Sequence, residues 1–78
     1  MARLTTQEFE KAEKNSTKLH NKVVATYTIV HADNEKVVQI DTYGSEERKF
    51  IGKCSQSIQI DKEMARRIME IFAEEGMV

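Results

Sequence analysis

The chain has 78 residues, of which 40% are hydrophobic, so it is long enough for one small domain and too short for two. Twelve Lys and Arg against thirteen Asp and Glu give a formal net charge of −1, which excludes the strong overall basicity of many nucleic-acid-binding domains. One cysteine excludes an internal disulfide and argues against a zinc site, and no apolar run reaches the roughly 20 residues of a membrane span. We therefore expect a cytoplasmic protein without metal or cofactor, whose small core is completed by a second copy in a homodimer.

The first 21 residues predict a polar helical arm (1–21). Helix-forming residues dominate from Leu4 to Leu19, and Thr5 precedes Glu8 with the spacing of a capping box. The apolar positions are too sparse for a wide buried stripe. We therefore expect an arm that docks weakly or contacts a partner.

Residues 22–60 carry the pattern of an antiparallel sheet. β-Branched and aromatic residues are dense in 22–32, the turn-forming Asp-Asn-Glu follows, and the strand pattern resumes in 36–43. A charged loop over 44–53 then leads to a further alternating run that ends at residue 60. The sequence predicts a hairpin followed by another strand.

Alternation within each strand separates two faces. In 36–43 the apolar Val38 and Ile40 share one face, whereas Val37, Gln39, Asp41 and Tyr43 point to the other. The last strand places Cys54, Gln56, Ile58 and Ile60 on one face, and Ser55, Ser57 and Gln59 on the other. Only one face of the sheet is therefore expected to be core.

The last segment, 61–76, predicts an amphipathic helix. The Asp61 carboxylate can accept amide protons of the first turn, and Gly76 ends the helix. Apolar residues recur at helical spacing and extend beyond one face, which favours both packing on the sheet and a helix–helix contact between copies. These core or dimer residues are Met64, Ile68, Met69, Ile71 and Phe72.

These elements together predict an α+β fold in a single domain, 1–78. Three antiparallel strands, with four as the alternative, are followed by an amphipathic C-terminal helix, and a short helical arm precedes them.

Catalytic patterns are weak in this chain. Asp41 followed by Glu47-x-Lys49 resembles the pattern of metal nucleases, but the latter two fall in the predicted loop, where a solvated charge run explains them better. Cys54 has no histidine beside it in the predicted topology, so we expect an inert, half-buried thiol. We predict a protein that is not an enzyme, with a metal nuclease as a third interpretation.

Aromatic and cationic residues occur on or beside the predicted hairpins. Single-stranded nucleic acid is held by this combination, because bases stack on rings and cations neutralise phosphates. The predicted nucleic-acid-binding residues are Lys36, Tyr43, Arg48, Lys49, Phe50 and Lys53. Residues 22–60 also contain five acids, so these charges can equally serve only to keep the surface hydrated.

The stretch "KVVQID", a charged loop, "IGKCSQSIQI" and an acid-capped helix together form a recognisable pattern. From Lys36 to Phe72 the chain resembles the C-terminal half of the single-stranded-DNA-binding transcriptional coactivators of the positive-cofactor-four type. The positions that carry this resemblance are Asp41, Gly52, Lys53, Ile58 and Ile60. Tyr43, Ile51 and Ser57 stand where that family usually has arginine, proline and glycine. The resemblance implies a curved antiparallel sheet, a helix-mediated homodimer, and unpaired DNA bound in grooves lined by aromatic and basic residues.

Two functions follow as predictions. The first is a small non-enzymatic protein that binds single-stranded DNA or RNA through a sheet face and the 44–53 loop, as a regulator of transcription or replication. The alternative is a protein-interaction module, or a small inhibitor, that docks on a larger enzyme through its edge strand or its N-terminal arm.

Overall fold

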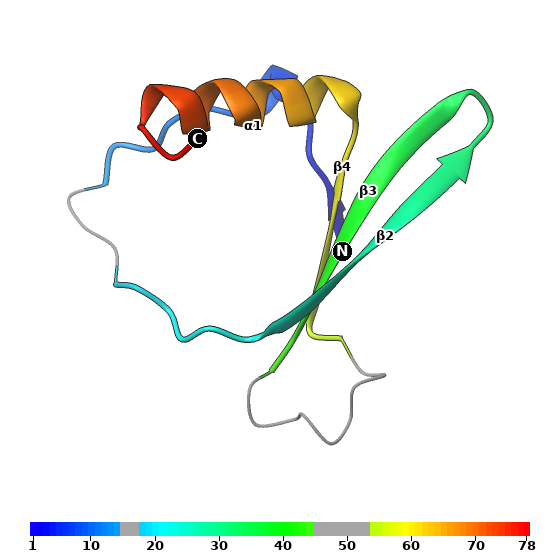
Figure 1. Cartoon of the computed structure of the whole chain (residues 1–78), viewed down its shortest axis with the longest axis horizontal. Helices are drawn as coiled ribbons and strands as arrows, with labels where there is room; N and C mark the ends of the chain where they lie inside the picture. The colour runs from blue at the N-terminus through cyan, green and yellow to red at the C-terminus, as the bar shows by residue number, and fades with distance from the viewer. Residues whose placement is uncertain (15–17, 45–53) are drawn as a thin grey trace.

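The structure is a computed structural model that describes residues 1–14, 18–44 and 54–78 (Figure 1). Its elements, in chain order, are β1 (Ala2–Arg3), the 3-10 helix η1 (Thr6–Glu8), β2 (Val24–Ala32), β3 (Glu35–Tyr43), β4 (Gln56–Ile60) and α1 (Lys62–Glu74). The strands form one four-stranded sheet in the order β1-β4-β3-β2. The fold is α+β, as the sequence predicts.

The hairpin of β2 and β3 follows the sequence prediction closely. The two strands pair along their whole length, from Val24 opposite Tyr43 to Ala32 opposite Glu35. At the turn, Asp33 has a φ of 53°, a left-handed conformation that Asp tolerates better than most residues. The predicted turn residues therefore form the turn, and the tolerance of Asp for a left-handed backbone is the physical reason.

The sheet differs from the prediction at its other edge. β4 pairs antiparallel with β3, but β1 pairs in parallel with β4, so the sheet is mixed. The pairing continues where the Leu4 amide donates to the Gln59 carbonyl at 3.0 Å. A strand of two residues shows no alternation in the sequence, which explains why an all-antiparallel sheet was the expectation.

The predicted N-terminal helix is wrong. Within the described part of 1–21, the helical segment is η1, where the Thr5 hydroxyl accepts a hydrogen bond from the Gln7 amide at 3.3 Å. Residues 9–14 and 18–23 have no regular secondary structure. An isolated helix pays a nucleation cost that tertiary packing must offset, and this arm lacks the apolar stripe that such packing needs.

The helix α1 begins and ends as the sequence predicts. The Asp61 carboxylate accepts from the Met64 amide at 2.9 Å, and Gly76 has a φ of 74° beyond the last turn. The main element contact of α1 is with η1, and Figure 1 shows it extending away from the β2–β3 hairpin. Within the described residues, no helix is long and apolar enough to cross a membrane.

The chain is unusually open. Its accessible surface is 7328 Å², whereas a folded monomer of 9.0 kDa exposes about 4,900 Å². Its radius of gyration is 14.6 Å, against about 11.5 Å for a compact domain of this length. Among the described residues the buried hydrophobic side chains are Val37 and Met64. A single chain therefore leaves much of its apolar surface in water.

Candidate nucleic-acid interface

The strand register divides the sheet into two chemically different faces. Because successive side chains alternate, and paired residues lie on the same side, each face is fixed by the pairing. The apolar face carries Tyr27, Ile29, Val38, Ile40, Ile58 and Ile60. The polar face carries Thr26, Thr28, Gln39, Asp41, Tyr43, Ser57 and Gln59, together with Val24, Val30 and Val37. The alternation that the sequence predicts within the strands is present, but the predicted core face is not the more buried one, because the buried Val37 and Ser57 lie on the polar face.

A chain of side-chain hydrogen bonds crosses the polar face between β3 and β4. Gln59 Nε2 donates to Gln39 Oε1 at 2.9 Å, and Gln39 Nε2 donates to the two Asp41 oxygens at 3.1 and 3.3 Å. From the neighbouring strand β4, Ser57 Oγ donates to Asp41 Oδ1 at 2.5 Å. Each bond fixes the next amide or carboxylate, so these four side chains (the polar network) form a preorganised row, in which Ser57 is buried and the other three are half-buried.

The polar network engages the carboxylate of Asp41, the first residue of the nuclease pattern. Its carboxylate accepts hydrogen bonds from Gln39 and Ser57, which anchor it to the sheet. The other two residues of the nuclease pattern, Glu47 and Lys49, lie outside the described residues. The nuclease interpretation gains no support from a carboxylate that is already engaged in this way.

Tyr43 lies at the end of the polar face from which the 44–53 loop departs. Its hydroxyl is 3.2 Å from the Thr26 hydroxyl, which holds the half-buried ring at the sheet. The chain returns nearby, because the Ser55 amide donates to the Thr42 carbonyl at 2.7 Å. Tyr43 and Ser55 therefore lie at the same end of the sheet. The predicted site residues Arg48, Lys49, Phe50 and Lys53 lie outside the described residues.

Lys36 lies far from this end of the sheet. It is near the hairpin tip, seven residues before Tyr43, which corresponds to about 23 Å along an extended strand. Its odd spacing from Tyr43 also places it on the opposite face of β3. The structure does not bring Lys36 and Tyr43 together in one site.

Cys54 is exposed and precedes β4, which differs from the expected half-buried strand residue. Its sulfur is 3.4 Å from the Ser57 hydroxyl. A serine hydroxyl does not act as the base that a nucleophilic thiol needs.

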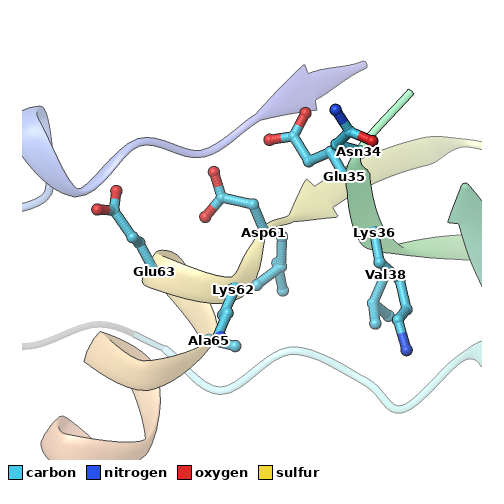
Figure 2. A pocket seen from close by; sticks show the side chains of 9 residues that line it. Asn34, Glu35, Lys36, Val38, Asp61, Lys62, Glu63 and Ala65 are labelled. Carbon is cyan, nitrogen blue, oxygen red and sulfur yellow. The ribbon is translucent and has the colours of Figure 1, made fainter. Parts of the chain in front are cut away.

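A second feature, a groove of about 680 Å³, lies between the hairpin tip and the start of α1 (Figure 2). Lys36, Val38 and Ala65 contribute to its lining. Figure 2 shows the carboxylates of Glu35 and Asp61 both on the side toward β1.

Arg3 ties these two carboxylates to β1. Its guanidinium donates to Glu35 and, at 3.4 Å, to Asp61. The bond to Glu35 is the main cause that raises the Arg3 pKa above its usual value. The pKa of Asp61 is lowered, first by the Met64 amide and then by Arg3. Because the acids are paired with Arg3 and the helix terminus, we interpret this end of the groove as a structural junction. In the part of the chain that is described, no group of three or more His, Cys, Asp or Glu is placed to hold a metal ion.

The predicted helix residues divide between the inside and the outside of α1. Met64 has no exposed surface, and Ile68 and Ile71 are half-buried. Met69 and Phe72 are exposed. The inner three pack within the chain, and the outer two are free to meet another surface.

Comparison of the chain with protein-family models, with curated proteins and with solved structures finds no match. The resemblance to positive-cofactor-four coactivators stays a prediction. Gln39, Ser57 and Gln59 are the site residues that the sequence prediction missed. Their alternation with Val and Ile was visible, but which polar residues lie opposite one another follows only from the strand register.

Proposed function

We propose that this protein binds single-stranded nucleic acid across the polar face, beside Tyr43 and the 44–53 loop. The observation that carries the proposal is the polar network, a row of amide, hydroxyl and carboxylate groups fixed on two paired strands. Unpaired bases offer hydrogen-bonding edges and ring faces that a duplex conceals, and a sheet face can meet several of them at once.

The phosphate contacts belong to the loop in this proposal. Residues 45–53 contain Arg48, Lys49 and Lys53 against two glutamates, so the local charge is favourable even though the chain as a whole is slightly acidic. Phosphate contacts made by cations add affinity that depends on salt and carries no sequence information.

A fluorescence-anisotropy titration tests the proposal, with single-stranded DNA, single-stranded RNA and duplex DNA of equal length. We expect binding to the single strands that weakens steeply with salt. The double variant Lys49→Ala with Lys53→Ala should reduce the slope of log affinity against log salt by about 1.4, because two phosphate contacts are lost. Lys36→Ala is the matched control, because that side chain lies on the other face, and it should leave the slope unchanged. Absence of single-strand binding at low salt contradicts the proposal.

We also propose that the working unit is a homodimer. The protomer exposes about 2,400 Å² more than a folded monomer of its mass, and two such surfaces match the 2,000–5,000 Å² buried in obligate homodimers. In this proposal the second copy packs on the apolar face, because Tyr27 is 73% exposed there and Ile29 is 43% exposed. Exposed aromatic residues on an apolar surface are typical anchors of protein interfaces.

One observation favours the alternative function, a protein-interaction module. In the described part of the sheet, β2 pairs with β3 alone and lies at the edge. A nine-residue edge strand can accept a strand from another protein by main-chain hydrogen bonds. A protein partner that stays bound after nuclease treatment in a pull-down, together with no oligonucleotide binding, favours this alternative over the first proposal.

A further inference from the structure

We propose that the side-chain amide of Gln59 binds the edge of one nucleobase. The base would lie in a pocket next to β1 on the polar face. This inference rests on the proposed function and assigns the group that is recognised there. The pocket has a volume of about 250 Å³ and is lined by Met1, Ala2, Arg3, Gln39, Ser57 and Gln59. Pockets for drug-sized ligands start at about 300 Å³, so this one fits a single flat ring system and not a whole nucleotide.

The free edge of the Gln59 amide supplies the recognition. A primary amide has two N–H donors and a carbonyl acceptor. One N–H of Gln59 donates to Gln39, and the hydrogen bonds of the described residues leave its second N–H and its Oε1 unused. A donor beside an acceptor on one planar group complements the edge of a base, and amide side chains are standard partners of base edges.

Gln39 acts as a positioning residue in this pocket. Its Oε1 accepts from Gln59 and its Nε2 donates to Asp41, so both ends of its amide are engaged. Ser57 holds Asp41 from the facing strand. The Gln59 amide is therefore oriented before any ligand arrives, which lowers the entropy cost of binding.

The charges around the pocket favour a neutral base over a phosphate. Arg3 is the cationic side chain of the lining, but its guanidinium is paired with Glu35 and Asp61. Asp41 adds a negative charge beside Gln39 on the same face. This carboxylate would repel a phosphate that approaches the pocket, whereas a neutral ring would contact Met1 and Ala2.

The experiment compares a fluorescent single-stranded DNA oligonucleotide with an abasic oligonucleotide of the same length and charge. The wild-type protein should bind the base-bearing strand several-fold more tightly. Gln59→Leu should weaken binding of the base-bearing strand by roughly fivefold or more, the value of one good amide–base pair, and leave binding of the abasic strand and the salt slope unchanged. Gln56→Leu, the same exchange on the other face of β4, is the control and should keep the wild-type preference for the base-bearing strand.

A second measurement does not depend on a variant. In the wild-type protein, the side-chain amide resonances of Gln59 should shift on addition of the base-bearing strand and stay in place with the abasic strand. If Gln59→Leu keeps the wild-type preference, or if these resonances do not move, the pocket assignment is wrong while the proposed function stands. If neither strand binds at all, both are wrong.

Discussion

Met64 is the most deeply buried described side chain, with 0% of its surface exposed. Met64→Ala should lower the free energy of unfolding by about 2–5 kcal/mol, because it removes buried methylene groups and leaves a cavity. Urea denaturation followed by circular dichroism measures the change. Met69→Ala is the matched control, since that side chain is 57% exposed on the same helix, and it should change stability by less than about 0.5 kcal/mol. Equal effects of the two substitutions would show that α1 is not docked by its Met64 side.

Asp61 links the stability of the fold to pH. Its folded-state pKa lies below its usual value because the carboxylate accepts from the Met64 amide and pairs with Arg3. The unfolded chain therefore binds the proton more readily than the folded one. The stabilisation is present above the usual pKa of 3.8 and is lost as the pH falls through the lower folded-state pKa.

Asp61→Asn tests this linkage, because asparagine caps a helix about as well as aspartate but does not titrate. Melting temperatures of both proteins should be measured at neutral pH and at intervals through the acid range. The wild type should melt higher at neutral pH, and its advantage should disappear in acid. An advantage that is constant over the whole range contradicts the assigned role of the charge.

At the scale of elements, the hairpin turn depends on the left-handed conformation of Asp33. Asp33→Val should reduce the free energy of unfolding by about 1–2 kcal/mol, because a β-branched residue strains this backbone region. Asp33→Gly should be neutral or stabilising, since glycine adopts a positive φ without strain. Denaturant titration of the two variants separates conformational strain from loss of the aspartate side chain. Destabilisation of the same size in both would instead point to the side chain.

The elements that the sequence predicts correctly are those whose signal is local. Alternation predicts β2, β3 and β4, and an acidic residue before a helical stripe predicts the start of α1. β1 is missed because its pairing uses backbone groups of two residues, which leave no pattern. The N-terminal helix is wrong because propensity without an apolar stripe does not decide the fold of a short segment.

The candidate site was predictable only in part, for a related reason. Tyr43 follows from its place before a charged loop, but the polar network depends on register, which sets Gln39 opposite Gln59 and Asp41 opposite Ser57. Charged, polar and apolar residues are mixed along β3. Only the paired strands reveal which polar side chains of one face lie opposite one another.

At the scale of the whole molecule, the two proposals give the two faces of the sheet separate partners. The polar face satisfies its own side chains through the polar network, so it can remain in water until a ligand binds. The apolar face has no such compensation, and the exposed Tyr27 and Ile29 leave apolar surface in contact with water. In these proposals the second copy and the nucleic acid therefore do not compete for one surface.

Ile29→Asp tests the homodimer, because a carboxylate cannot be buried in an apolar interface without a partner charge. Wild-type protein at micromolar concentration should sediment at twice the 9.0 kDa mass of the chain, and its melting temperature should rise with concentration. Ile29→Asp should shift the mass to that of one chain or abolish the folded signal in circular dichroism, because an obligate dimer has no stable folded monomer. Thr28→Asp introduces the same charge on the polar face and should remain a dimer. A wild-type monomer with a melting temperature independent of concentration contradicts the assembly, and dissociation of both variants contradicts the assignment of the apolar face as the interface.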